Sequence, residues 1–166
     1  MLPKGTIIHK VLGMSEDSSV VTFITSAGVF EMLHHQDCCE HVYLADVNGD
    51  EKDLEEATVV HFEERTQDGA KASHDSITWT FYDIQTNKGC VNLRWIGESN
   101  GYYSEGVSFD RLTTKKALMH VPNSVPVRVW MTETGYVYIY QSNHPKFSQY
   151  SKVNMDDYGL TIIAEV

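Results

Sequence analysis

Eight consecutive residues hold the densest group of reactive side chains in the sequence: His34-His35-Gln36-Asp37-Cys38-Cys39-Glu40-His41. All except Gln36 could bind a metal, and zinc favours thiolates and imidazoles. Structural zinc sites usually gather their ligands in two separated pairs, and neither C-x-x-C nor H-x-x-x-H spacing occurs in this run. Adjacent cysteines in a strand point to opposite faces, so only one would readily join a single site unless a turn intervenes. We therefore expect no cofactor, with zinc bound through His35 and Cys38 as the alternative.

The same run has a second interpretation, as a site of cysteine catalysis. Cys38 or Cys39 would be the nucleophile, and a neighbouring histidine would lower its pKa and accept its proton. The catalytic candidates are then His35, Cys38 and Glu40, although the run lacks the surroundings typical of known cysteine enzymes. In a purely structural interpretation, one cysteine packs in the core while Asp37 and Glu40 accept hydrogen bonds from backbone donors at a turn.

A second candidate site lies at residues 98–104, where aromatic rings stand beside hydrogen-bonding groups. Small polar ligands and protein hot spots both favour that mixture. A plain solvent-facing turn is the alternative interpretation. The ligand-binding candidates here are Arg94, Trp95, Glu98, Asn100, Tyr102 and Tyr103.

An antiparallel hairpin over residues 91–110 is predicted to present this second site. Asn100-Gly101 accepts the positive φ angles of a type I′ turn, whose twist matches that of paired strands. The predicted register places Ser99 opposite Tyr102, Trp95 opposite Gly106, Arg94 opposite Val107 and Glu98 opposite Tyr103. The indole would then cover a strand glycine, and Arg94 would lie diagonal to Glu105.

The rest of the chain is dominated by strand patterns. Strands are predicted over residues 6–12, 19–25 and 29–33 as a meander, then over 41–47, 58–64, 76–84, 127–131, 136–140 and 160–165, with a helix over 51–57 capped by Asp50. The expected fold is mainly β, of the α+β class: a twisted antiparallel sheet, or a partly open barrel or sandwich, with one short helix. The composition changes after Leu112, which divides the chain into a mostly antiparallel domain over residues 1–112 and a C-terminal β extension over 113–166 packed on the same domain.

Composition narrows the classes of function. Three cysteines and no recognisable secretion signal favour reduced thiols in a cytoplasmic protein. No apolar stretch approaches the roughly 20 residues that span a bilayer. The net charge of −10 disfavours direct binding to nucleic acid, because phosphate binding depends on Lys and Arg. The charge is also uneven: residues 31–64 hold 11 acids and one base, whereas residues 111–154 hold six bases and one acid.

Several motifs, taken in order along the chain, resemble those of small bacteriophage proteins catalogued only as a domain of unknown function. They are HQDCCEHV from His35, NGD from Asn48 with Asp53-Leu54, WTFY from Trp79, and RWIGESNGYYS from Arg94. The resemblance covers roughly residues 2–112 and implies a phage origin and action inside a bacterial host cell. It assigns no reaction, and the segment after Leu112 departs from the usual length of that family.

The leading hypothesis is a non-enzymatic binding protein encoded by a phage, a counter-defence factor that captures a host protein or a small nucleotide signal in the host cytoplasm. It depends on the absence of catalytic motifs, on the excess of acids over residues 31–64 and on the aromatic residues at 98–104. Two alternatives stay open: a metal- or cysteine-dependent enzyme centred on the His-Gln-Asp-Cys-Cys-Glu run, and a structural phage component. The expected partner is a host protein or a small-molecule ligand, and a homo-oligomer is left open. Neither direct binding to nucleic acid nor binding to a membrane is expected.

Overall fold

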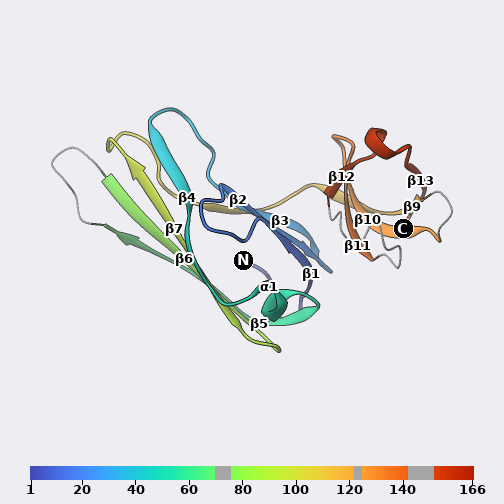
Figure 1. The fold of residues 1–166 in the computed structure, drawn as a ribbon, viewed down its shortest axis with the longest axis horizontal. Coiled ribbons are helices and arrows are strands. Elements are labelled where there is room, and N and C mark those ends of the chain that lie inside the picture. Colours follow the sequence, from blue (N-terminus) through green and yellow to red (C-terminus); the bar gives the residue numbers. More distant parts are fainter. Residues whose placement is uncertain (70–75, 122–124, 142–151) are drawn as a thin grey trace.

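The computed structural model describes residues 1–69, 76–121, 125–141 and 152–166, which form two antiparallel β-sheets (Figure 1). The strands are β1 (Ile7–Leu12), β2 (Val20–Thr25), β3 (Gly28–Leu33), β4 (Glu40–Asn48), β5 (Ala57–Asp68), β6 (Ser76–Thr86), β7 (Cys90–Ser99), β8 (Ser108–Arg111), β9 (Thr114–His120), β10 (Val127–Thr132), β11 (Tyr136–Gln141), β12 (Lys152–Asn154) and β13 (Thr161–Glu165). A short α-helix, α1 (Glu51–Leu54), follows β4, and a single 3-10 turn, η2 (Asp156–Tyr158), precedes β13. Within the described ranges, no helix is long and apolar enough to cross a membrane. The predicted mainly β class, with antiparallel open sheets and one short α-helix in these ranges, is confirmed.

The first sheet contains eight strands in the order β4-β7-β6-β5-β1-β2-β3-β8. Its β1-β2-β3 part is the predicted meander. Phe23 and Met32, from that meander, belong to the same buried cluster as Leu44 of β4 and Trp95 of β7. The core therefore sits between the two halves of one curled sheet, and the ends of its strands carry the loops.

The helix α1 forms around the predicted cap. The Asp50 side chain accepts a hydrogen bond from the Lys52 backbone N–H at 2.9 Å, and the Asp53 side chain accepts one from the Asp50 N–H at 3.3 Å. The helix ends at Leu54, earlier than predicted, because Leu54 is buried in the core and the next residues turn the chain toward β5. Glu56 makes that turn with a positive φ of 50°.

The prediction of a hairpin over residues 91–110 is wrong. β7 ends at Ser99, and its two neighbours in the sheet are β4 and β6, so both of its hydrogen-bonding edges are occupied. The chain after residue 99 cannot pair back onto it. It instead crosses the end of the sheet and forms β8, which pairs with β3 on the far side.

The turn at Asn100-Gly101 also differs from the predicted type. Gly101 has a positive φ of 83°, but Asn100 is not among the described residues with positive φ, whereas a type I′ turn needs both. Side chains close the turn instead: the Ser99 hydroxyl accepts from the Gly101 N–H at 3.0 Å, and the Asn100 side-chain oxygen accepts from the Tyr102 N–H at 3.2 Å. The Asn-Gly signal therefore marks a turn correctly but does not build a hairpin.

The second sheet has the strand order β12-β11-β10-β9-β13 and its own apolar cluster, which includes Met119, Val129 and Val137. The predicted hairpin of residues 127–131 and 136–140 forms β10 and β11. In the first sheet, β5 runs to Asp68, beyond the predicted strand end at residue 64, and residues 70–75 lie outside the described residues.

A third apolar cluster joins the two sheets. Ile24 and Val29 from the first sheet pack with Trp130 and Tyr138 from the second. The Trp130 indole N–H donates to the Thr25 carbonyl at 3.0 Å, which satisfies a buried donor across the junction. The segment from residue 113 onward thus adds a second layered unit beside β1–β3 (Figure 1).

Candidate functional site

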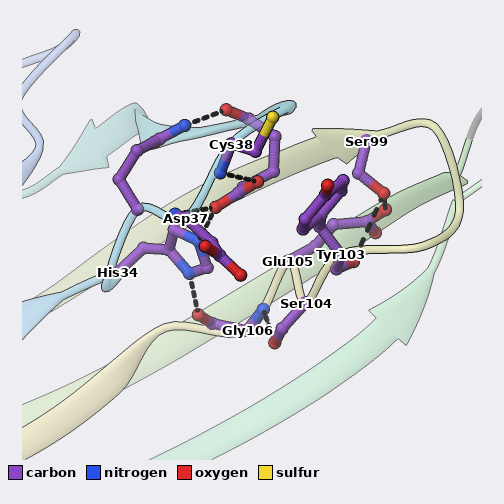
Figure 2. Close-up of polar contacts among 10 residues, drawn as sticks. His34, Asp37, Cys38, Ser99, Tyr103, Ser104, Glu105 and Gly106 are labelled. Carbon is purple, nitrogen blue, oxygen red and sulfur yellow. Dashed lines mark hydrogen bonds and ion pairs between the residues drawn. The ribbon is translucent and has the colours of Figure 1, made fainter.

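The two segments singled out in the sequence meet at one end of the first sheet (Figure 2). Residues 34–39 connect β3 to β4, and residues 100–107 connect β7 to β8. The sheet itself brings them together, because Glu40 at the start of β4 lies opposite Ser99 at the end of β7. We call residues 34–39 and 100–107 the paired loops.

Glu40 organises the first loop from inside. It is only 5% exposed, and its carboxylate accepts hydrogen bonds from the backbone N–H groups of Asp37 and Cys38, the latter at 3.1 Å. These donors, above all the Asp37 N–H, lower the pKa of Glu40 to about 2, against the opposing effect of burial. The predicted structural role is confirmed for Glu40, whereas Asp37 contributes a backbone donor to this turn.

His34 ties the first loop to the second. Its Nδ1 donates to the Gly106 carbonyl at 2.8 Å, and its Nε2 lies 3.3 Å from the Glu40 carboxylate (Figure 2). Through these two contacts His34 links the Glu40 carboxylate to the backbone of the second loop.

Glu105 plays the matching role in the second loop. It is 6% exposed, and its carboxylate accepts from the hydroxyls of Ser99 at 2.6 Å, Thr78 at 2.7 Å and Ser76 at 3.4 Å. These three donors belong to β7 and β6, so the loop is fixed to the end of the sheet. The predicted diagonal contact between Arg94 and Glu105 does not form.

A glycine allows this close approach. A Cβ added to Gly97 of β7 would lie 2.5 Å from the Glu105 carbonyl oxygen and 2.6 Å from its Cβ. Gly106, predicted to sit under Trp95, has only the Ser104 hydroxyl at 3.6 Å near such a Cβ. Glu105 of the second loop therefore packs against Gly97 of β7. Gly106 of the loop makes no such close contact with β7.

The outer side of the paired loops exposes aromatic and thiol groups. Tyr102 is 90% exposed, while Tyr103 is half-buried. The Cys38 side chain, within reach of the Tyr103 hydroxyl, raises the pKa of Tyr103. Cys38 also raises the pKa of the exposed Cys39 thiol by hydrogen bonding, and burial and nearby carboxylates add to that effect. The expectation that one cysteine of this pair packs in the core is wrong, because both are exposed.

The other predicted site residues scatter around the sheet. Trp95 is fully buried in the core. Arg94 lies on the opposite face, 3.6 Å from the Asp46 carboxylate and with its guanidinium carbon 5.3 Å from the centre of the Trp79 ring. Glu98 is exposed on β7.

The structure does not gather the proposed catalytic or metal-binding groups. The exposed His35 imidazole lies 3.8 Å from the Asp110 carboxylate. In the part of the chain that the structure describes, no three His, Cys, Asp or Glu side chains are grouped so that they could hold a metal ion. A raised pKa at Cys39 is the opposite of what a nucleophilic thiol requires.

Sequence reasoning missed His34, Ser99 and Glu105 as organising residues. His34 contacts Gly106, 72 positions away, and Glu105 contacts Ser76, 29 positions away, so no local pattern marks these contacts. One signal was present: Gly97 lies inside a strand pattern, and an isolated strand glycine often marks close approach by another backbone.

Comparison with known protein families matches residues 4–109 to the family described as Domain of unknown function (DUF7448). Both paired loops lie inside the matched region, and β9–β13 lie outside it. No curated protein and no solved structure gives a match.

Proposed function

We propose that this chain, which belongs to the DUF7448 family of domains of unknown function, is a non-enzymatic binding protein of a bacteriophage that captures a host protein in the bacterial cytoplasm. The paired loops are its binding surface. One observation carries this proposal: two buried carboxylates, Glu40 and Glu105, each hold one of the paired loops, and Tyr102 on the second loop is 90% exposed.

Preorganisation supports binding by these loops. Association costs free energy when loops and side chains must be ordered, and that cost is smaller when the loops are fixed beforehand. The His34 bridge and the Glu105 hydroxyl contacts fix both loops to the sheet. A tyrosine in such a setting offers a large contact area and a hydroxyl, the combination that recurs in interface hot spots.

The contacts that the reactive side chains already make favour binding over catalysis. Glu40 is occupied by backbone donors and Glu105 by hydroxyls, so neither offers free acceptor groups to a substrate. The imidazole of His35 contacts Asp110, and the Cys39 thiol is held toward its neutral form. These residues act as supports and surface groups of the loops.

Substituting Tyr102 tests the proposal. The full-length chain is immobilised, exposed to lysate from phage-infected host cells, and its captured protein is identified by mass spectrometry and purified for titration. We expect Tyr102→Ala to weaken the complex by about thirtyfold, the effect of losing a hot-spot side chain. Tyr136→Ala, which removes an exposed tyrosine of the second sheet, is the matched control and should leave the dissociation constant unchanged.

The proposal fails if the captured protein binds Tyr102→Ala and Asn100→Ala as tightly as it binds the unmodified chain. Thermal unfolding of each variant shows whether its fold is retained. Tyr102 makes few contacts that stabilise the fold, so a loss of affinity without a loss of stability assigns the effect to the surface.

A further inference from the structure

A cavity of about 480 Å³ lies between the two sheets, away from the paired loops. Its volume is within the range of sites for small organic ligands. The lining combines aromatic and charged side chains from both sheets: His9, Glu56, Lys116, Arg128, Trp130 and Tyr140. The cavity exists only because the second sheet packs against the first.

Strand alternation explains why these residues face the cavity together. Lys116 of β9 lies directly opposite Trp130 of β10, and Arg128 is two positions before Trp130 on the same face. Tyr138 of β11 also lies opposite Trp130, and Tyr140 is two positions further along its strand. One face of the second sheet therefore presents two cations and three aromatic rings toward the first sheet.

The aromatic rings form a continuous wall. The ring centroids of Trp130 and Tyr140 are 5.7 Å apart, and those of Tyr140 and His9 are also 5.7 Å apart. Trp130 is buried and fixed by its hydrogen bond to Thr25, so it forms the floor. Tyr140 and His9 are only half-buried and offer contact area to a planar ring.

Neither cation has an acidic partner among the residues that the structure describes. No ion pair joins Lys116 or Arg128 to a carboxylate of the described residues. The acid in the lining, Glu56, contacts His9 Nδ1 at 3.3 Å. The Lys116 ammonium lies over the Trp130 ring, 5.2 Å from its centre, in a cation–π contact that positions its charge beside the aromatic residues. In a chain of net charge −10, Lys116 and Arg128 thus bring two positive charges to the lining of one cavity.

We infer that this cavity binds a mononucleotide, with the phosphate between Lys116 and Arg128 and the base against Tyr140 and His9. Arginine and lysine donors match phosphate oxygens, and aromatic side chains stack on the π-face that every base has. The two features occur side by side in one cavity of suitable size. The site is separate from the paired loops, and its failure would leave the proposed capture of a protein untouched.

Isothermal titration of the full-length chain tests this site. The probes are AMP, GMP, CMP and UMP, with adenosine and inorganic phosphate as separate arms, all at one ionic strength. We expect saturable 1:1 binding of at least one nucleotide, tighter than binding of adenosine or of phosphate alone. Arg128→Ala and Lys116→Ala should each weaken it roughly tenfold or more, because each removes a hydrogen-bonding charge.

Lys115→Ala is the matched control. Lys115 precedes Lys116 on β9, points to the other face and lies 3.8 Å from the Glu165 carboxylate, so its loss removes the same charge without touching the cavity. A second readout is the indole N–H resonance of Trp130, which should shift with nucleotide while that of Trp79 does not.

Three results would overturn the inference. The first is no saturable binding of any of the four nucleotides at millimolar concentration. The second is equal affinity for inorganic phosphate or adenosine, which would remove either the base or the phosphate from recognition. The third is an unchanged dissociation constant in a folded Arg128→Ala variant.

Discussion

Single residues decide the shape of the paired loops, and two of them are carboxylates that a sequence pattern would assign to the surface. An ionised carboxylate is stable away from water only where donors surround it. Glu40 meets this condition with backbone N–H groups and His34, and Glu105 meets it with three hydroxyls. Each residue stabilises the conformation of its loop through these hydrogen bonds.

Lowering the pH should destabilise the first loop, because it protonates Glu40. Its folded-state pKa of about 2 lies below its ordinary value of 4.5, so the charged form contributes stability that is present above pH 4.5 and is lost as the pH falls toward 2. Urea unfolding of the unmodified chain and of Glu40→Gln should therefore show a free-energy difference that shrinks across this window. Glu98→Gln, which removes an exposed carboxylate of β7, controls for net charge and should cost less stability at neutral pH. A difference independent of pH would show that the Glu40 charge does not hold the loop.

Local roles at this scale could be predicted, and distant ones could not. The sequence indicated that Glu40 accepts from a turn because its donors, Asp37 and Cys38, are near neighbours. The contact of His34 with Gly106 depends on the order in which the strands pair in the sheet, and no local residue pattern predicts it.

Among the elements, β7 has the greatest influence on the site. It is held between β4 and β6, and its end aligns Ser99 with Glu40 on one side and with Ser76 on the other. The prediction of a strand before the Asn100-Gly101 turn is confirmed. Its partners were predicted wrongly because an Asn-Gly turn is a short-range signal, whereas pairing with β4 depends on residues about 50 positions earlier in the chain.

Packing of the second loop on β7 predicts a difference between two glycines. Gly97→Ala should lower the free energy of unfolding by about 1–3 kcal/mol, because its Cβ would overlap the Glu105 backbone. Gly106→Ala should change it by less than about 0.5 kcal/mol, since the nearest atom would be in ordinary contact. Chemical denaturation of both variants measures the two values. Equal costs would mean that the loop does not lie on Gly97.

The two candidate sites lie in different places in the whole molecule. The paired loops belong to the first sheet and to the region matched by the family, whereas the cavity requires β9–β11 and lies at the junction stabilised by Trp130. The charge asymmetry of the sequence has a structural counterpart here: Lys116 and Arg128, from the base-rich segment, face the cavity between the sheets. The sequence shows which segment carries net positive charge. Only the packing of the sheets shows that two of its cations line one cavity.

The most direct test of the paired loops as the binding surface is hydrogen–deuterium exchange of the full-length chain, alone and in complex with the host protein it captures. Binding there should slow exchange of the backbone amides of residues 34–39 and 100–107, and leave β9–β13 unchanged. Protection confined to the second sheet, with both loops exchanging as in the free chain, would contradict the proposed surface.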